Sequence, residues 1–157
     1  MKIYLAGFIN GNVLDKCLEW RKQIREHFDV NSKWHGKLTF LDPLNGKDFE
    51  MIDGEGLKSN IPGHAFIGRD HKCVKIADLL IVSLDTFGEP RPLTGTIYEL
   101  AWAWMYKTPV IVITTDRYYS EHPFIQDTAG IIVSSVDELL EKEYIQYYYK
   151  GLVTASY

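Results

Sequence analysis

Apolar residues along the chain fall into short runs of strand length separated by longer stretches with helical spacing. Three of the short runs, ADLLIVSL, PVIVITT and GIIVSS, are apolar almost throughout. Such runs are typical of strands that are buried on both faces of a parallel sheet. With two shorter β-type runs, they predict five strands, at residues 2–6, 38–41, 77–84, 109–115 and 130–135.

Helical spacing of apolar residues appears between these strands. Leu14, Leu18, Ile24 and Phe28 recur close to a 3.6-residue period, which predicts a helix from about Val13 to Phe28. Further helices are predicted from residue 62 or 63 to about 76, around Glu99, and from 136 to about 150. Because strands alternate with helices, we expect one α/β domain over residues 1–157. Its sheet should be five-stranded, mostly parallel and covered by helices on both faces, as in flavodoxin-like or Rossmann-like folds.

The loops that follow the predicted strands are the expected place of a ligand site. In open α/β sheets, ligands bind beyond the carboxyl ends of the strands. Those ends lead here into GFINGN, DPLNGKD, DTFGEPRPLTGT and TTDRYYSEHPF. Residues 45–60 show little periodicity and three glycines, and we predict a long loop there. Loops of this length in compact domains are often functional.

Composition and charge argue against two classes of partner, nucleic-acid polymers and membranes. Of the 157 residues, 46% are hydrophobic and 24% charged, which is ordinary for a soluble domain. The net charge of −4 argues against a nucleic-acid polymer as partner, because a polyanion requires a basic face. No apolar run reaches the roughly 18 residues of a membrane span, and we expect a cytoplasmic protein that does not bind a membrane.

Metal and dinucleotide motifs do not occur in the sequence. Cys17 and Cys73 are far apart and read as buried free thiols, and the five histidines form no metal-binding pair. The GFINGN turn has neither the GxGxxG nor the P-loop spacing. We therefore expect no metal and no cofactor.

Glu99 is the first candidate for chemistry, because it interrupts the apolar run GTIYELAWAW. A carboxylate is costly to bury without a partner. The residue lies about one turn into a helix that follows a strand-end loop, so it should face the ligand edge, where the helix N-terminus favours negative charge. The alternative is a carboxylate that serves only the helix dipole or pairs with Arg91.

Asp70 is the second candidate. It lies mid-helix among His64, Arg69, His71 and Lys72, and the alternative is a solvated charged face.

Other acids and glycines stand at strand ends. Asp85 follows a buried strand and is well placed to contact a ligand, whereas Asp78 precedes that strand and could cap or turn. Asp42 begins an Asp-Pro turn. Gly7 and the GFINGN turn that it opens could let the backbone approach a ligand closely.

Four segments resemble the nucleoside 2-deoxyribosyltransferase family: KIYLAG, RDHKCVKIADLLIVSLD, GTIYELAWA and the aromatic-rich close YYYKGLVTASY. The resemblance implies that Glu99 is the nucleophile that attacks C1′ of a 2′-deoxynucleoside, displaces the base and forms a covalent glycosyl-enzyme. It further implies that Asp70 holds the sugar or assists proton transfer near the leaving base. An oxocarbenium-like transition state suits a carboxylate close to C1′.

The resemblance also implies a substrate pocket, and one departure affects it. The pocket would be formed by Gly7, Phe8, Asn10, Asp85, Leu93, Thr94, Gly95 and Tyr157. Many transferases carry an Asp six residues before the nucleophile, where this chain has Leu93. Nucleotide N-glycosidase relatives have a small hydroxyl residue nearby, and Thr94 is adjacent. Their phosphate-binding turn resembles GSIRGG, whereas GFINGN lacks its Ser and Arg.

Two alternatives to transfer therefore remain open, namely hydrolysis by a 2′-deoxynucleoside or 5′-monophosphate N-glycosidase, and a non-catalytic nucleotide-binding domain. The expected partners are small nucleosides and nucleobases. The resemblance also implies a homo-oligomer, a dimer or larger. The tyrosines at 144, 147, 148, 149 and 157 are a candidate interface, the alternative being packing of this segment on its own domain.

Overall fold

Five parallel strands form the central sheet of the computed structural model, which describes residues 1–31, 33–46, 49–52 and 56–153. Their order is β2-β1-β5-β6-β7, and each neighbouring pair is parallel, which confirms the predicted five-stranded parallel sheet. The strands are β1 Lys2–Gly7, β2 Thr39–Leu41, β5 Leu79–Ser83, β6 Val110–Ile113 and β7 Ile131–Val133. The chain runs outward from β1 to β2 and then crosses to β5 on the other side of β1. The strand order therefore reverses between β1 and β5, where such sheets bind ligands.

Alternating side chains of the buried strands supply two separate cores. On β1, Tyr4 and Ala6 face one side of the sheet while Ile3 and Leu5 face the other. All four side chains are fully buried, as expected for strands covered on both faces.

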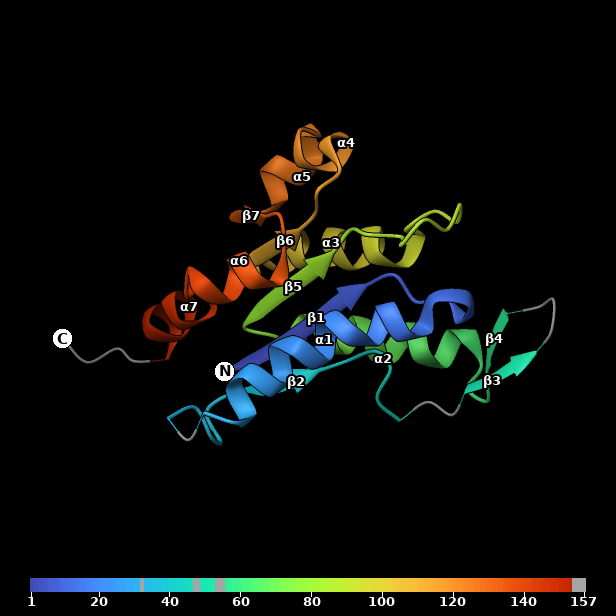
Figure 1. The fold of residues 1–157 in the computed structure, drawn as a ribbon, viewed down its shortest axis with the longest axis horizontal. Helices are drawn as coiled ribbons and strands as arrows, with labels where there is room; N and C mark the ends of the chain where they lie inside the picture. Colours follow the sequence, from blue (N-terminus) through green and yellow to red (C-terminus); the bar gives the residue numbers. More distant parts are fainter. Residues whose placement is uncertain (32, 47–48, 53–55, 154–157) are drawn as a thin grey trace.

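Helices cover both faces of this sheet (Figure 1). Apolar side chains of α1 Leu14–Asp29, α6 Val136–Glu141 and α7 Tyr144–Leu152 join one core. Side chains of α2 Gly63–Ile76, α3 Thr94–Tyr106 and α5 Pro123–Thr128 join the other. A 3-10 turn η1 Gly11–Val13 precedes α1, and a short helix α4 Arg117–Ser120 precedes α5. Within the described part of the chain, no helix is long and apolar enough to cross a membrane.

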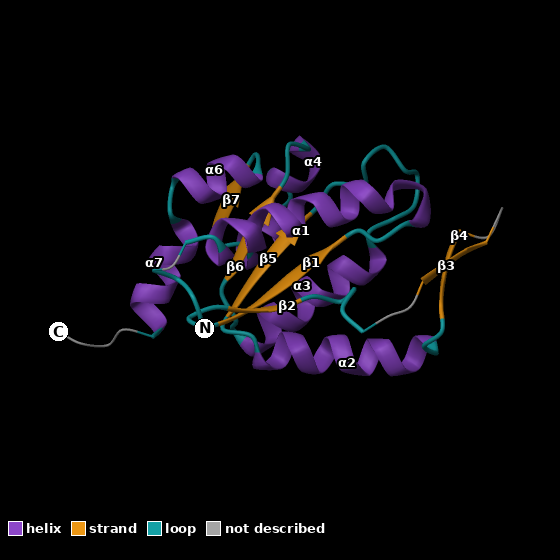
Figure 2. Ribbon diagram, turned by 60° about the horizontal axis from the view of Figure 1, so that its bottom comes forward, coloured by secondary structure: helices purple, strands orange, loops and turns teal. Residues whose placement is uncertain are grey.

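The prediction of a structureless loop over residues 45–60 is wrong. This segment contains β3 Phe49–Ile52 and β4 Gly56–Ser59, which pair as an antiparallel hairpin apart from the main sheet (Figure 2). Each strand is only four residues long, which is too short for a period-2 pattern to stand out from the surrounding glycines.

The single C-terminal helix predicted over 136–150 is two helices. Glu143 adopts a left-handed backbone conformation with a φ of 54°, so α6 ends before it and α7 begins after it. A non-glycine residue rarely adopts this conformation, and the sequence KEY carries no glycine or asparagine to signal it.

Candidate active site

A cavity of about 520 Å³ opens beyond the carboxyl ends of β1 and β5. It is enclosed by the turn after β1, the loop before α3, and parts of α2 and α3. Eight of the residues predicted to form the site line this cavity: Gly7, Phe8, Asn10, Asp70, Leu93, Thr94, Gly95 and Glu99. The fold thus brings together segments that lie up to ninety-two positions apart, from Gly7 to Glu99.

Glu99 is held by a residue that the sequence analysis did not single out. The Tyr4 hydroxyl on β1 donates a hydrogen bond to Glu99 Oε1 over 2.6 Å. Glu99 is only 8% exposed, and Tyr4 is fully buried. A donated hydrogen bond favours the ionised carboxylate. After the exposed Lys2, Tyr4 carries the one polar side chain of the buried part of the strand KIYLAG, and this was the signal that could have identified it.

The charges of both candidate carboxylates, Glu99 and Asp70, act on the hydroxyl group of Tyr4. Burial, and then the negative charges of Glu99 and Asp70, raise the pKa of Tyr4 far above its ordinary value. Tyr4 therefore stays protonated and acts as a fixed hydrogen-bond donor, and it cannot supply a proton to a leaving group. Because Asp70 acts on the same hydroxyl, the two acids share one electrostatic environment.

Asp70 is not part of a solvated charged face, since it is 8% exposed and lines the cavity. Its neighbour Arg69 donates from Nε and Nη2 to Asp70 Oδ1, over 3.0 and 2.8 Å. Arg69 also donates to the backbone carbonyls of Pro43 and Asn45, in the loop after β2. One guanidinium thus links the orientation of Asp70 to the position of the cavity wall at Pro43.

Packing behind the cavity leaves little room for a side chain at Gly7. A Cβ atom at this position would lie 3.0 Å from the Trp20 ring and 3.2 Å from the Ser83 carbonyl oxygen. The Gly7 carbonyl accepts a hydrogen bond from Arg21 Nη2 over 3.1 Å. The turn after β1 is therefore fixed to α1 from below, while its upper side faces the cavity.

Asp42 has a structural role that goes beyond the predicted turn. Its Oδ1 accepts from the Leu44 N–H over 2.9 Å, as an Asp-Pro turn start should. The same carboxylate lies 3.6 Å from Arg21 Nε and 3.2 Å from Arg25 Nη1. Arg21 is fully buried, and burial lowers its pKa against the opposing effect of the Asp42 charge.

The remaining predicted residues lie elsewhere. Asp85 is exposed, accepts from the Phe87 N–H over 2.6 Å and does not line the cavity. Asp78 accepts from the Lys2 N–H over 2.7 Å, so its carboxylate binds the start of β1, a role that the cap or turn considered for it does not describe. Tyr157 lies outside the described residues. Thr96, 4% exposed, lines the cavity and was not predicted.

Across the residues with described placement, no group of three or more His, Cys, Asp or Glu side chains is positioned to hold a metal ion. Of the two free thiols, Cys17 is buried and Cys73 is partly exposed.

A second, larger concavity of about 710 Å³ lies between α3 and the α4–α5 segment. It shares Pro92, Leu93 and Thr94 with the first cavity, so the two are adjacent. Its wall is mostly apolar and includes the exposed aromatic side chains of Tyr98, Trp104, Tyr118 and Phe124. The carboxylates that could do chemistry lie in the smaller cavity.

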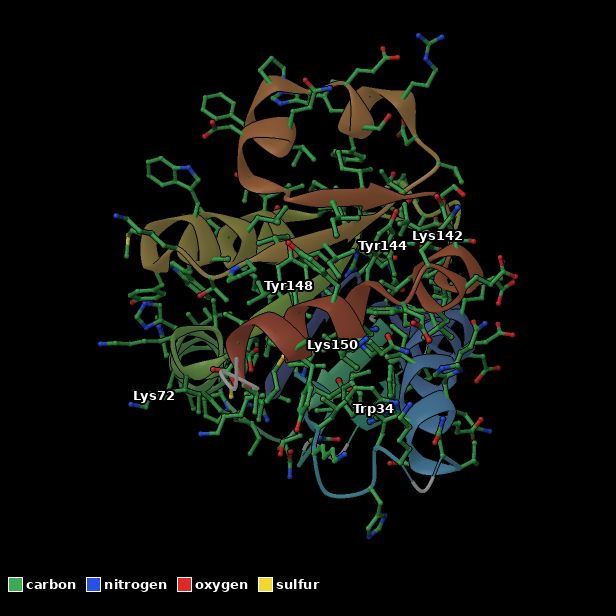
Figure 3. All side chains as sticks on the ribbon, turned by 90° about the vertical axis from the view of Figure 1, so that its left-hand side faces the viewer. Trp34, Lys72, Lys142, Tyr144, Tyr148 and Lys150 are labelled. Atoms are coloured by element: carbon green, nitrogen blue, oxygen red, sulfur yellow. The ribbon has the colours of Figure 1, made fainter. Side chains whose placement is uncertain are left out.

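The tyrosines of α7 mostly pack on their own domain. Tyr144 and Tyr148 contact the core formed with α1 and α6, on the face shown in Figure 3. Tyr149 meets Trp34 edge to face with ring centroids 5.0 Å apart. Tyr147, at 67% exposure, remains available to a partner.

No family model and no curated protein matches this chain. Several solved structures, however, match this chain. A conserved protein from Enterococcus faecalis V583 superposes with a TM-score of 0.62 at 20% identity, covering 93% of this chain and 98% of the other. A 2-deoxyribosyltransferase from Leishmania mexicana superposes with a TM-score of 0.63 at 16% identity, covering 97% and 99%. The CMP N-glycosidase BcmB from Clostridium botulinum gives 0.54 at 15% identity, covering 93% and 99%.

The chain shares the fold of these proteins. The predicted fold class is thereby confirmed, and the transferase and the N-glycosidase correspond to the two enzyme classes that the sequence motifs resemble.

Proposed function

We propose that this protein transfers a 2-deoxyribosyl group between nucleobases through a covalent intermediate on Glu99. The observation that carries the proposal is that Glu99 and Asp70, from two different helices, line one cavity, with the Tyr4 hydroxyl bonded to Glu99. The fold shared with a 2-deoxyribosyltransferase supports it.

In the first half-reaction, a carboxylate oxygen of Glu99 attacks C1′ of the donor. The bond from C1′ to the base nitrogen breaks, and its electron pair leaves with the base, which takes up a proton. Asp70 is positioned to hold the sugar or to pass on this proton. In the second half-reaction, a nitrogen of the incoming base attacks C1′, the C1′–O bond to Glu99 breaks, and the base loses its proton. Glu99 is regenerated as a carboxylate.

The walls of the cavity favour transfer over hydrolysis. Phe8, Phe66 and Leu93 are apolar lining residues, and such walls exclude water from a reactive intermediate. Leu93, 3% exposed, offers a base an apolar contact and no carboxylate. We therefore expect base selectivity to depend on shape more than on a hydrogen bond from this position.

Hydrolysis is the second candidate, in which water in place of a base resolves the Glu99 intermediate. It is favoured by the departure at Leu93 and by the fold shared with a CMP N-glycosidase. A non-catalytic nucleotide-binding domain is the third possibility.

One chromatographic assay separates these functions. Purified protein is incubated with 2′-deoxyinosine or thymidine and with free adenine or cytosine. We expect 2′-deoxyadenosine or 2′-deoxycytidine to form. Release of base and free sugar without a new nucleoside would establish the hydrolase. Absence of turnover, together with thermal stabilisation by deoxynucleosides, would establish the binding domain.

We further propose that the protein is a homo-oligomer. Subunit contacts commonly bury apolar surface of the kind that is exposed here. It comprises Tyr147 and the exposed aromatic side chains of the larger concavity between α3 and the α4–α5 segment. Light scattering should give a mass of at least two chains of 18.1 kDa. A mass of one chain at assay concentration would contradict this.

A further inference from the structure

Arg69 contacts Asp70 in a way that their places on α2 do not by themselves produce. Successive residues of a helix point in different directions, so their side chains do not normally face each other. Here the Arg69 guanidinium donates from Nε and Nη2 to a single oxygen of Asp70, Oδ1, over 3.0 and 2.8 Å. A constraint from outside α2 must therefore turn the guanidinium toward Asp70.

The loop after β2 supplies that constraint. Arg69 Nη1 donates to the Asn45 carbonyl over 2.7 Å, and Nη2 donates to the Pro43 carbonyl. With the two bonds to Asp70, four of the five N–H groups of the guanidinium are used. The loop is itself closed as a turn, because the Asn45 N–H donates to the Asp42 carbonyl over 3.0 Å. The loop thus fixes the position of the guanidinium beside Asp70.

Asp70 is the member of this pair that reaches the cavity. Its side chain is buried and lines the cavity together with Glu99, whereas the side chain of Arg69 is 36% exposed and does not line it. Arg69 can therefore act on a bound donor only through Asp70. Two hydrogen bonds from one guanidinium orient the carboxylate, and the positive charge beside it favours the ionised form.

Negative charge gathers around Asp70, which makes a neighbouring cation important. Like charges in one site favour protonation of one of them. Burial and then the charge of Asp70 raise the pKa of Cys73, and the charge of Arg69 opposes them. Among the described residues, the charged and titratable groups that surround Asp70 are Arg69 and Cys73 on α2, Tyr4 on β1, Glu99 on α3 and the exposed Arg91 before α3.

We propose that Arg69 is a positioning residue, which holds Asp70 ionised and oriented in the cavity as a hydrogen-bond acceptor for the sugar of the donor. An ionised Asp70 has no proton to give to the leaving base, so of its two candidate roles this inference selects the holding of the sugar. The inference rests on the proposed function and deepens it.

The test is a double-mutant cycle. The ratio kcat/KM for base release from the four common 2′-deoxynucleosides is measured with the unmodified protein, Arg69→Gln, Asp70→Asn and the double variant. Arg25→Gln, alone and combined with Asp70→Asn, is the control. Arg25 contacts the same loop through Asp42 over 3.2 Å, and its side chain is 31% exposed, so the control removes a comparable charge from the loop. Thermal unfolding establishes that each variant is folded.

We expect Arg69→Gln to lower kcat/KM about tenfold or more, because hydrogen bonds to a charged group are lost. Once Asp70→Asn is present, the further loss should be less than about threefold. Arg25→Gln should change kcat/KM by the same factor in both backgrounds. Equal losses from Arg69→Gln in both backgrounds, or no loss in either, would overturn the inference and leave the proposed activity intact.

Arg69→Lys adds a conservative comparison. An ammonium keeps the charge but cannot present the planar fork, so it should restore only part of the lost kcat/KM. The same cycle with Arg69→Lys applies if Arg69→Gln does not fold, and equal losses in both backgrounds would again overturn the inference.

The pH profile gives a readout that a purely structural role of Arg69 would not move. If ionised Asp70 is required, kcat/KM falls toward low pH. Loss of the Arg69 charge makes Asp70 easier to protonate, so the acid limb should move to higher pH by about one unit in Arg69→Gln. It should stay in place in Arg25→Gln. An unmoved limb in Arg69→Gln, or a kcat/KM that rises as the pH falls, would contradict the proposed role.

Calorimetric titration with the same deoxynucleosides keeps the two proposals separate if no protein turns over any donor. Binding that Arg69→Gln weakens in the unmodified background, but not in the presence of Asp70→Asn, would uphold the role of Arg69 and reject the activity. Binding that is weakened equally in both backgrounds, or in neither, would reject the role as well. Absence of binding by every deoxynucleoside would overturn both proposals.

Discussion

Replacing Glu99 with Gln should lower turnover of the preferred deoxynucleoside by about a thousandfold or more while the protein stays folded, because the amide cannot form the glycosyl bond. Loss of a nucleophile removes the covalent route as a whole and leaves only the contributions of binding and polarity. The measurement is kcat for base release, with circular dichroism and thermal unfolding to establish that the fold is retained.

Tyr4→Phe provides a graded comparison for this variant. It removes the hydrogen bond to Glu99 Oε1 but keeps the carboxylate and almost all of the buried ring. A hydrogen bond to a charged group contributes roughly 1.5–3 kcal/mol, so we expect a loss of about ten- to a hundredfold. Equal losses of kcat in Tyr4→Phe and Glu99→Gln would indicate that the site has collapsed. Full activity of a folded Glu99→Gln protein would contradict the assignment of Glu99 as the nucleophile.

The covalent intermediate can also be observed directly. The unmodified protein, mixed with a deoxynucleoside and no acceptor base, should gain the mass of a deoxyribosyl group, and peptide analysis should place it on Glu99. The Glu99→Gln protein should gain none. A turnover-competent protein that never carries the adduct would favour direct displacement without a glycosyl-enzyme.

The sheet and most of the cavity wall could be predicted because their signals are local. The buried runs of β5 and β6 identify central strands by composition alone. The rule that ligands bind at strand ends then places GFINGN and the loop before α3 at one edge. Glu99 stood out because an acid in an apolar helix is uncommon.

What could not be predicted depends on contacts between distant segments. The bond between Tyr4 and Glu99 joins residues 95 positions apart, and that between Asn10 and Glu89 joins residues 79 apart. Asp70 adjoins Arg69, His71 and Lys72 in a sequence that is typical of a solvated face, and its burial follows from how α2 packs beside α3. The break at Glu143 occurs among good helix formers, so no local preference announces it.

The buried pair of Arg21 and Asp42 should contribute strongly to the stability of the region behind the cavity, where α1 packs against the turn after β1. Arg21 is fully buried, donates to the carbonyls of Cys17 and Gly7, and lies beside Asp42. Removing one partner of a buried pair leaves the other charge uncompensated and costs about 3–5 kcal/mol. We therefore expect Arg21→Met to lower the free energy of unfolding by about this amount. At about 2–4 °C per kcal/mol for a domain of this size, Tm should fall by roughly 10 °C.

The neighbouring residue supplies the control for Arg21. Lys22→Met makes a similar change one position along α1, where Lys22 forms an exposed pair with Glu26 at 3.6 Å. Such pairs contribute about 0–1 kcal/mol, so Tm should move by no more than a few degrees.

A double variant, Arg21→Met with Asp42→Leu, should recover part of the stability, because it removes the uncompensated carboxylate together with its partner. Arg25 would then lose its contact with Asp42, which keeps the recovery incomplete. If Arg21→Met instead unfolds within about 2 °C of the unmodified protein, the ion pair contributes little to stability, and the turn after β1 is held mainly by its packing at Gly7.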